Sequence, residues 1–246
     1  MVKNFFENKV ILVTGASSGL GKTFANHFIN KGSKVIVCSR RNKFRSKFYK
    51  NNKNFFFYKF DLNNINRIKL FVTKIKKKFK RIDILINNAG VAIPQSIDQL
   101  TAENLFKSFK VNFFSPSLIT KEVLKIMKKH NFGRIVNLSS GGAVNCAQNY
   151  LSYSSSKAAL NTLTKTVSKE VLNYDIKINS MSPGPCKTPM FPKNKLSTKF
   201  CLPTIDYLTS LNSKGPTGKF FWFLNEISIF PDLSKIDWSK PQKLKK

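Results

Sequence analysis

Short apolar runs alternate with longer amphipathic stretches along most of this chain, and this alternation limits its possible folds more than any other feature. The runs are rich in Val, Ile, Leu and Phe with little polar alternation, which is typical of strands buried on both faces. They cover Val10–Thr14, Lys34–Ser39, Phe55–Phe60, Ile82–Asn87, Arg134–Ser139 and Lys177–Ser180. Helical patterns lie between them at 19–31, 43–50, 64–80, 101–130 and 153–173. The alternation predicts an α/β fold built of βαβ units, with a parallel sheet and helices on both faces.

No linker rich in Pro, Gly or Ser and no internal repeat divides the chain, so residues 1–246 are expected to form a single domain. The composition changes after Pro183, because residues 185–217 carry five prolines and scattered lysines. A loop of this length in a compact domain is usually functional. We expect one short helix within it, near Ile205–Leu211.

The formal net charge of +31 first suggests a nucleic-acid-binding surface. The excess is nearly all lysine, is spread along the chain, and accompanies abundant Asn, Ile and Phe, a combination favoured by AT-rich codons. Its densest cluster, between Lys76 and Arg81, falls at the end of a predicted helix, where cations suit the helix dipole. We therefore expect a solvated basic surface with weak attraction for anionic substrates and no specific nucleic-acid partner.

The cysteines and the apolar runs indicate a cytoplasmic protein. The four cysteines form no C-x-x-C pair and only two histidines accompany them, so no metal site is expected, and free thiols suit a reducing compartment. No secretory signal pattern is visible. The longest aromatic-apolar runs, Phe55–Tyr58 and Phe220–Leu224, are far shorter than the ~20 residues of a membrane helix.

A glycine-rich loop follows the first predicted strand and opens the first helix. Gly15 permits a tight turn, Gly19 lets a pyrophosphate approach the backbone, and Gly21 allows the helix to pack on the sheet. The spacing is G-x-x-x-G-x-G instead of the more common G-x-G-x-x-G, but the strand–turn–helix context favours dinucleotide binding over a turn without a ligand. The predicted cofactor contacts in this loop are Gly15, Ser17, Ser18, Gly19, Leu20 and Gly21.

The end of the second strand indicates which dinucleotide is bound. An NAD site would place an acidic residue here to accept from the ribose 2′-hydroxyl, and none is present. Arg40 and Arg41 can instead hold a 2′-phosphate, which arginine binds bidentately. We therefore predict NADP(H) in preference to NAD(H).

Tyr153 and Lys157 are four residues apart in a helical stretch and share one face. A nearby ammonium favours a phenolate, so Lys157 is expected to lower the pKa of Tyr153 from its ordinary value of about 10 towards the working pH. The spacing alone is a weak signal in a lysine-rich chain. It gains weight from Ser139 and Ser140 at a strand end and from the upstream glycine-rich loop.

In combination, these residues resemble the short-chain dehydrogenase/reductase family over about residues 5–190, and weakly again near 217. The resemblance implies a Rossmann-type, doubly wound domain with a seven-stranded parallel sheet in the order 3-2-1-4-5-6-7. It also implies a homodimer or homotetramer that pairs through the helices near 101–130 and 153–173. The matching motifs are Thr14–Gly21, Asp61-Leu62, Asn87-Asn88-Ala89-Gly90, Asn112, Ser140, Tyr153 with Lys157, and Pro183-Gly184.

The resemblance implies a catalytic role for four residues. Tyr153 would be the general acid/base, and Ser140, thirteen residues before it, would hydrogen-bond the substrate oxygen; Ser139 is the competing assignment. Lys157 would hold the cofactor ribose, and Asn112 would position a water in a proton relay.

The resemblance also implies further cofactor contacts. Asp61 would contact the adenine amino group, with a helix cap as the less favoured alternative that is compatible with this role, and Leu62 would line the adenine pocket. The remaining contacts are Asn88, Ala89 and Gly90 beside the ribose, and Pro183, Gly184 and Thr188 around the nicotinamide.

The carboxyl-terminal part departs from the family pattern. Pro216-Thr217-Gly218 fits the approach to the last strand, but no Gly-Gly follows and the tail at about 225–246 diverges. The run Phe220–Phe223 is interpreted as an aromatic core strand, with a reshaped substrate pocket or subunit contact as the alternative. Residues 185–217 would form a substrate loop, and its lysines are expected to be solvated.

These observations favour an NADP(H)-dependent oxidoreductase that transfers a hydride between nicotinamide and a small carbonyl or secondary alcohol. Two other enzymes remain as alternatives: a 3-oxoacyl-acyl-carrier-protein reductase of fatty-acid synthesis, and a sugar or nucleotide-sugar ketoreductase of polysaccharide biosynthesis. A cofactor-binding regulatory protein is the alternative outside catalysis. Asn112, Ser140, Tyr153 and Lys157, present together, weigh against it.

Overall fold

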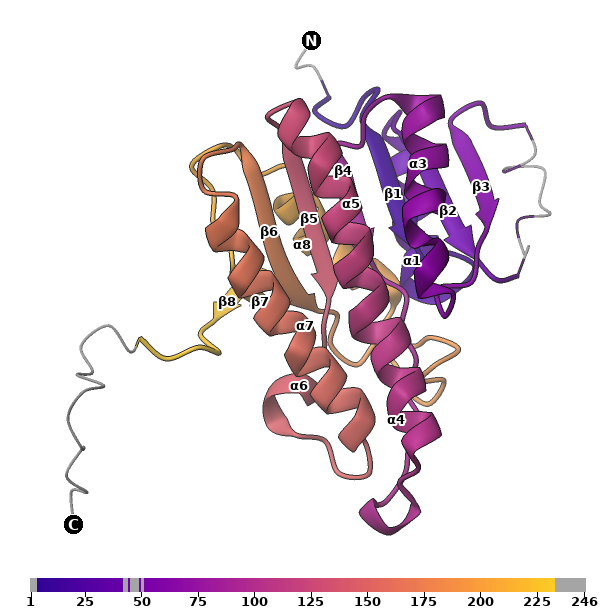
Figure 1. The fold of residues 1–246 in the computed structure, drawn as a ribbon, viewed down its shortest axis with the longest axis vertical. Helices are drawn as coiled ribbons and strands as arrows, with labels where there is room; N and C mark the ends of the chain where they lie inside the picture. The colour runs from indigo at the N-terminus through magenta and orange to yellow at the C-terminus, as the bar shows by residue number, and fades with distance from the viewer. Residues whose placement is uncertain (1–3, 42–43, 45–48, 50, 233–246) are drawn as a thin grey trace.

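The computed structural model describes residues 4–41, 44, 49 and 51–232. Within them lies one eight-stranded sheet in the order β3-β2-β1-β4-β5-β6-β7-β8 (Figure 1). Its strands are β1 Val10–Thr14, β2 Lys34–Ser39, β3 Phe55–Lys59, β4 Ile84–Asn87, β5 Gly133–Leu138, β6 Ile176–Ser182, β7 Phe220–Trp222 and β8 Asn225–Ile227. The predicted α/β class and the parallel order 3-2-1-4-5-6-7 are confirmed.

The predicted number of seven strands was wrong by one. After β7 the chain turns at Phe223, which has a φ of 51°, and returns as β8, antiparallel to β7. Tight hairpins of this kind usually carry Asn or Gly at positions with positive φ, so Phe223-Leu224 gave no turn signal.

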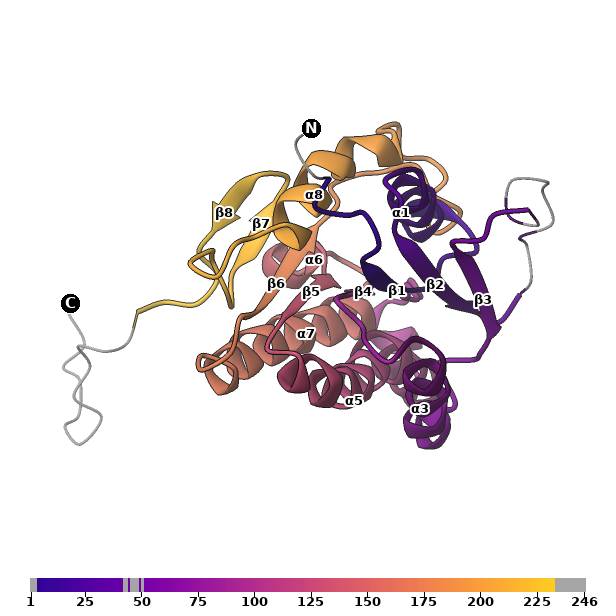
Figure 2. The same ribbon diagram turned by 90° about the horizontal axis from the view of Figure 1, so that it is seen from above.

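Helices cover both faces of the sheet. Figure 2 shows α1 Gly19–Asn30 and α8 Leu202–Thr209 on one face, and α3 Ile68–Phe79, α5 Ser115–Lys129 and α7 Leu151–Glu170 on the other. Shorter elements are α4 Ala102–Phe109, α6 Gly142–Asn145, and the 3₁₀ turns η1 Ile65–Arg67, η2 Ile97–Gln99 and η4 Thr198–Cys201. The helix predicted at 43–50 falls mostly outside the described residues.

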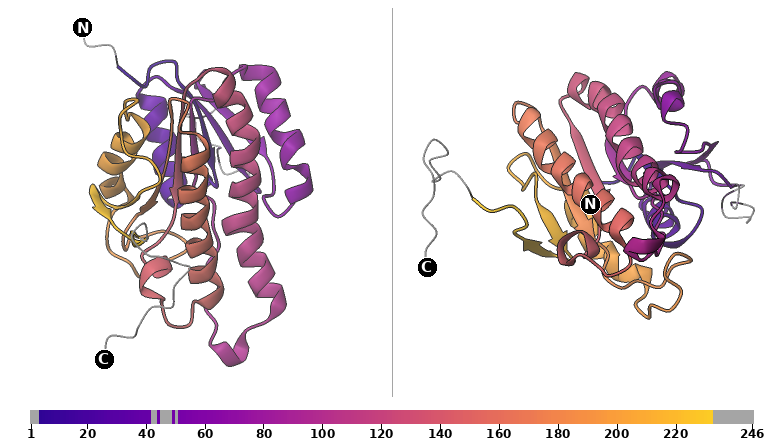
Figure 3. Two further views of the ribbon diagram at one scale, coloured as in Figure 1. Left: turned by 60° about the vertical axis from the view of Figure 1, so that its left-hand side comes forward. Right: turned by 60° about the horizontal axis from the view of Figure 1, so that its bottom comes forward.

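The long helix predicted at 101–130 is present but irregular. It begins at Thr101, whose hydroxyl accepts a hydrogen bond from the Asn104 amide at 3.2 Å. Between α4 and α5 the chain forms one π-helical turn, Lys110–Phe114, here called η3. Figure 3 shows the resulting rod running beside α7. Such turns often mark functional sites, and this one buries Asn112 completely.

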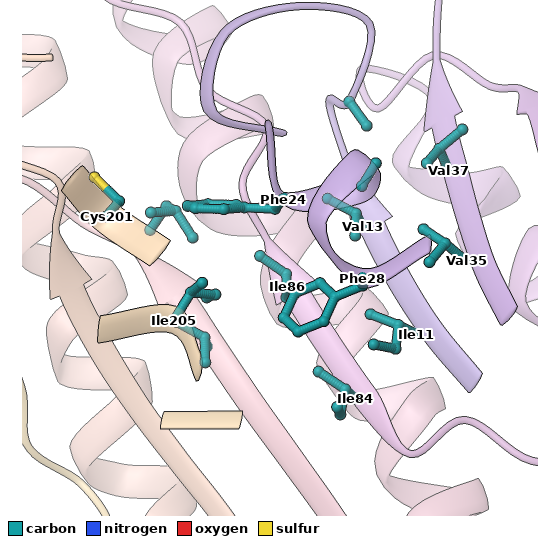
Figure 4. Close-up of a cluster of buried hydrophobic side chains, with 14 of the residues drawn as sticks. Ile11, Val13, Phe24, Phe28, Val35, Val37, Ile84, Ile86, Cys201 and Ile205 are labelled. Atoms are coloured by element: carbon teal, nitrogen blue, oxygen red, sulfur yellow. The ribbon is translucent and has the colours of Figure 1, made fainter. Parts of the chain in front are cut away.

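Each face of the sheet carries its own apolar core, which explains the continuous apolar runs. Along β1, Ile11 and Val13 face α1 and α8, while Val10 and Leu12 face the helices on the other side. Figure 4 shows the first core, where Phe24 and Phe28 of α1 lie on the strands beside residues of the α8 region. A strand buried on both faces has no room for polar alternation.

The segment after β6 is more structured than a plain loop. It returns to its own start through a bridge between Cys186 and Leu196, and it then forms η4 and α8, the helix predicted near 205–211. Asp206 of α8 contacts His27 at 2.8 Å and Lys31 at 2.7 Å, which fastens the segment to α1. No helix in the described residues is long and apolar enough to span a bilayer.

Candidate active site

A cavity of about 710 Å³ lies at the carboxyl ends of β1 to β7. Each of these strands ends in a residue or loop that lines it, which is where ligands bind in open parallel sheets. Of the residues predicted to contact cofactor or substrate, only Gly21 and Asn112 are not on its wall. The others are Gly15, Ser17, Ser18, Gly19, Leu20, Arg40, Arg41, Asp61, Leu62, Asn88, Ala89, Gly90, Ser140, Tyr153, Lys157, Pro183, Gly184 and Thr188.

The glycine-rich loop is packed so tightly that side chains would not fit. Gly15 has a φ of 67°, and a methyl group on it would lie 2.7 Å from the Cα atom of Ala89. A methyl group on Gly21 would lie 2.8 Å from the Gly15 carbonyl oxygen and would also meet the Asn88 side chain. Gly21 therefore packs against the side of the loop that faces away from the cavity, whereas the other predicted contact residues of the loop line the cavity.

The start of α1 suits a phosphate group. Ser18, the N-cap residue, makes no side-chain capping bond, and no acidic residue lies in the first turn. The first backbone N–H groups of a helix lack partners within the helix, so they are available to an anion. A methyl group on Gly19 would lie 3.3 Å from Thr188, which shows that the segment after β6 reaches over this loop.

The turn after β4 is held against the glycine-rich loop. The hydroxyl of Thr14 accepts hydrogen bonds from the amides of Asn88 and Ala89, both at 3.1 Å. The side chain of Asn88 donates to the carbonyls of Thr14 at 2.9 Å and Gly15 at 3.2 Å. These contacts fix Ala89 and Gly90 on the cavity wall.

The far end of the cavity carries the charged residues that follow β2 and β3. Arg40 and Arg41 are exposed and line it, as does Asp61. Asp61 also accepts hydrogen bonds from the amide and the side chain of Asn63, both at 3.0 Å, so it stabilises the turn while facing the cavity. The Leu62 carbonyl accepts a hydrogen bond from the Ser115 hydroxyl, which positions the adjoining wall.

Tyr153 lies on the cavity wall with 8% of its surface exposed. Burial raises the pKa of its hydroxyl, a hydrogen bond from Ser140 opposes the rise, and Tyr150 adds to it. Ser140 is therefore the serine next to Tyr153, while the Ser139 hydroxyl points to the Lys157 carbonyl at 3.5 Å. The geometry places Ser140, and not Ser139, beside the Tyr153 hydroxyl, and a hydrogen bond from Ser140 to the substrate oxygen stays a prediction.

Lys157 is buried with 3% of its surface exposed, and its ammonium donates to the Leu138 carbonyl at 2.5 Å. Burial lowers the pKa of Lys157 to about 8. The expected lowering of the Tyr153 pKa by Lys157 is wrong for this structure, where the net shift is upwards. The reason is that both groups are buried, and desolvation opposes the charged form of each.

Asn112 stands behind the cavity and makes three hydrogen bonds. Its side chain accepts from the Val91 amide at 2.8 Å and donates to the Val91 carbonyl and the Ser156 hydroxyl, both at 2.9 Å. The residue therefore joins the loop after β4 to α7. Its placement of a water in a proton relay stays a prediction.

Several lining residues were not predicted from the sequence. Tyr150 and Phe191 pack against Tyr153. Met190, in the segment after β6, and Trp222, the last residue of β7, line the same cavity. Trp222 was signalled by its aromatic run, whereas Phe191 carried no signal. The described residues contain no group of three His, Cys, Asp or Glu that could hold a metal ion.

Comparisons with known proteins agree with this arrangement. A family model described as short chain dehydrogenase matches residues 9–198. A dehydrogenase/reductase SDR family protein 7-like of Drosophila melanogaster is 31% identical over 194 residues, which cover 76% of this chain but only 60% of that relative. A 3-oxoacyl-acyl-carrier-protein reductase of Thermotoga maritima is 31% identical over 218 residues, 87% of this chain and 85% of the relative.

Solved structures extend the likeness to three dimensions. The structure of ElxO with NADP bound matches with a TM-score of 0.80 at 27% identity, and covers 88% of this chain and 97% of that one. A 4-hydroxyisoleucine dehydrogenase complexed with NADH matches with a TM-score of 0.78 at 29% identity, and covers 87% of this chain and 96% of that one. Of these two neighbours, one therefore holds NADP and the other NADH.

Proposed function

Because this chain belongs to the short-chain dehydrogenase/reductase family, whose members bind NAD(P), we propose that it is an NADP(H)-dependent oxidoreductase acting on a carbonyl or secondary alcohol. The observation that carries the proposal is the convergence of Tyr153, Ser140 and Lys157 on one cavity wall. The same cavity reaches the glycine-rich loop and the arginine pair at its other end.

Tyr153 is the general acid/base of the proposed reaction. When bound, the nicotinamide cofactor supplies or accepts the hydride, and the protein supplies position and a proton. In reduction, the Tyr153 hydroxyl gives its proton to the carbonyl oxygen, where negative charge develops, and the Ser140 hydroxyl donates a hydrogen bond to that oxygen. Burial raises the pKa of the Tyr153 hydroxyl. In oxidation the same hydroxyl takes the proton back from the alcohol, by the reverse of this step.

The cofactor preference rests on the end of β2. Arg40 and Arg41 lie on the cavity wall, and no carboxylate accompanies them on that strand. Asp61, on the neighbouring strand end, already accepts two hydrogen bonds from Asn63. The arrangement favours a 2′-phosphate over a free ribose hydroxyl, and hence NADP(H).

The decisive experiment is Tyr153→Phe. Removal of the hydroxyl should lower kcat for ketone reduction by about a thousandfold and leave cofactor affinity unchanged, because acid/base catalysis contributes on the order of 10²–10⁴ in rate. Turnover is followed by the absorbance of reduced nicotinamide, and affinity by calorimetry. Tyr207→Phe is the matched control, since Tyr207 lies on α8 away from this cavity. Retained turnover in Tyr153→Phe would refute the assignment.

A second candidate function is reduction of 3-oxoacyl thioesters, favoured by the long alignment with the Thermotoga maritima reductase. Acetoacetyl thioesters assayed beside simple ketones and nucleotide sugars would separate this activity from the others. Turnover of the thioester alone would assign the chain to fatty-acid synthesis.

We also propose a homo-oligomeric assembly and a cytoplasmic location. A homodimer or homotetramer is supported by apolar side chains exposed on the rod and on α7: Phe106, Phe114 and Leu151. A cytoplasmic location is supported by the cysteines, all four of which are free. Light scattering and cell fractionation test these two proposals.

A further inference from the structure

The two ends of the cavity differ in the side chains that line them. Its charged lining residues within the described chain are Arg40, Arg41, Asp61 and Lys157. The first three follow β2 and β3, at the opposite side of the sheet from β7. Beyond Tyr153, towards β6 and β7, the wall carries no charged side chain, and is formed by Gly141, Gly142, Asn145, Ala147, Tyr150, Pro185, Met190, Phe191 and Trp222.

The rings of Tyr150 and Phe191 form one cluster with the ring of Tyr153, the proposed acid. The ring centroids of Tyr150 and Phe191 lie 6.2 Å and 6.3 Å from that of Tyr153, and 6.2 Å from each other. Their planes are inclined by 56–71°. Inclined rings at this spacing present edges and faces that suit another ring, because aromatic pairs prefer edge-to-face and offset arrangements.

Trp222 and Met190 complete this wall and remain partly exposed. Trp222 is 43% exposed and Met190 41%, although both line the cavity. Trp222 pairs in register with Ser182 at the end of β6, and its indole nitrogen lies beside Gly184. Large apolar side chains left open at a cavity mouth gain free energy when an apolar ligand covers them.

Among the residues that the structure describes, none at this end of the cavity offers a charged partner to a charged substrate. The lysines of the substrate loop do not line the cavity: Lys187, Lys193, Lys195 and Lys199. Lys157 is held by the Leu138 carbonyl. A carboxylate or phosphate placed beside Phe191 would lose its hydration without gaining an ion pair, which is costly.

We infer that the substrate is a neutral ketone or secondary alcohol carrying an aryl or alicyclic ring, which is bound against Tyr150, Phe191 and Trp222. The inference rests on the proposed function, since it places the reacting oxygen at Tyr153 and Ser140. The ring then lies on the β6–β7 side of Tyr153, away from the arginine pair.

Binding to the full chain saturated with NADP⁺ tests this inference without requiring turnover, because a ketone and an oxidised cofactor do not react. Calorimetry compares the methyl ester of para-acetylbenzoate with the free carboxylate, and acetophenone with an open-chain methyl ketone of equal carbon number. The ester should bind at least about tenfold more tightly than the carboxylate. Acetophenone should bind about three- to tenfold more tightly than the open-chain ketone. If NADP⁺ does not bind, NAD⁺ replaces it.

Phe191→Leu and Trp222→Leu test whether these side chains bind the ring of the ketone. Each should weaken acetophenone binding by about three- to tenfold and open-chain ketone binding by less than about twofold, because leucine keeps the apolar surface and removes the ring. Phe200→Leu is the control, since Phe200 is 61% exposed and outside the cavity, and it should change neither.

Equal or tighter binding of the carboxylate would overturn the inference, as would equal losses for the ring and open-chain ketones in Phe191→Leu. These outcomes are separate from failure of the proposed function, which shows as absent hydride transfer to every ketone and thioester despite cofactor binding. Selective binding of the ring ketone with turnover supports both proposals, whereas the same selectivity without any turnover would refute the proposed function and leave only the ring-binding wall supported.

Discussion

The nucleotide end and the substrate end of the cavity are built on different physical principles. At the nucleotide end, methyl groups added to Gly15 and Gly21 would lie within 2.8 Å of backbone atoms, and two exposed arginines line the cavity. At the substrate end, inclined rings and a partly exposed tryptophan form a wall without charge. The first end is complementary to a phosphate-bearing molecule of one shape, whereas the second is complementary to apolar surface.

The comparison shows where specificity can change without loss of the fold. The nucleotide end is made of turns after β1, β2 and β4, whose residues also hold the sheet together, so few substitutions are tolerated there. The substrate end is carried largely by the segment after β6, which is joined to α1 through Asp206 of α8. Four predictions test this contrast.

Gly21→Ala should have the largest effect, because its methyl group would meet the Gly15 carbonyl at 2.8 Å and the Asn88 side chain. We expect about a hundredfold loss of cofactor affinity and a loss of about 3 kcal/mol in the free energy of unfolding. Gly141→Ala is the matched control, since its methyl group would approach only the Ser182 hydroxyl, at 4.0 Å. Calorimetry measures the cofactor affinity of each variant, and denaturant unfolding measures its stability. Equal losses in Gly21→Ala and Gly141→Ala would contradict the predicted difference between the two ends of the cavity.

Lys157 lies between the two ends, and its burial predicts a pH dependence of stability. Its pKa is about 8 in the fold and 10.5 ordinarily, so between these values the unfolded chain holds a proton that the folded chain lacks. The free energy of unfolding contributed by this group therefore rises with pH across that window, by up to about 3 kcal/mol.

Lys157→Met should abolish this rise, and the difference between the two proteins isolates it from all other groups. Denaturant unfolding at several pH values between 8 and 10.5 measures the difference. Lys169→Met, an exposed lysine on the same helix, should keep the wild-type slope. Parallel curves for wild type and Lys157→Met would show that the ammonium is not desolvated.

Removal of the arginine pair should weaken the preference for NADPH over NADH. In Arg40→Ala/Arg41→Ala, the ratio of kcat/KM with NADPH to that with NADH should fall by about thirtyfold, as charge-assisted hydrogen bonds to the phosphate are lost. Arg67→Ala is the control, since Arg67 is exposed and does not line this cavity. Wild-type preference for NADH, or an unchanged ratio in the variant, would contradict the assignment.

Asp206→Asn should have the smallest effect, about 1 kcal/mol of stability, because its ion pairs with His27 and Lys31 are partly exposed. Burial alone would raise the pKa of Asp206, but hydrogen bonds and charges from these partners lower it overall. The stabilisation is thus present above pH 3.8 and is lost as the pH falls below it.

Thermal unfolding of wild type and Asp206→Asn at pH 7 and at low pH measures this loss, and the two proteins should converge in acid. Glu226→Gln, which removes an exposed pair with Lys219, should have no measurable effect. A larger effect of Glu226→Gln would mean that the hairpin of β7 and β8, not α8, holds the substrate end.

Local patterns in the sequence were sufficient for most of the fold. The apolar runs from Val10 to Ser180 predicted six strands, and the glycine spacing between Gly15 and Gly21 predicted the dinucleotide loop, because these signals depend on neighbours along the chain. Tyr153 and Lys157 were recognised for the same reason, since one helical turn places them on one face.

Features of the site that depend on contacts between distant segments were decided only by the tertiary structure. The position of Ser140 beside Tyr153, the upward shift of the Tyr153 pKa and the bonds of Asn112 to Val91 all depend on strands and helices far apart in sequence. The meeting of Tyr150, Phe191 and Trp222 has no local signature either. Sequence neighbours therefore determined which residues we propose for hydride transfer. Long-range packing, which sets desolvation and shape, determined the aromatic wall against which we infer that the substrate binds.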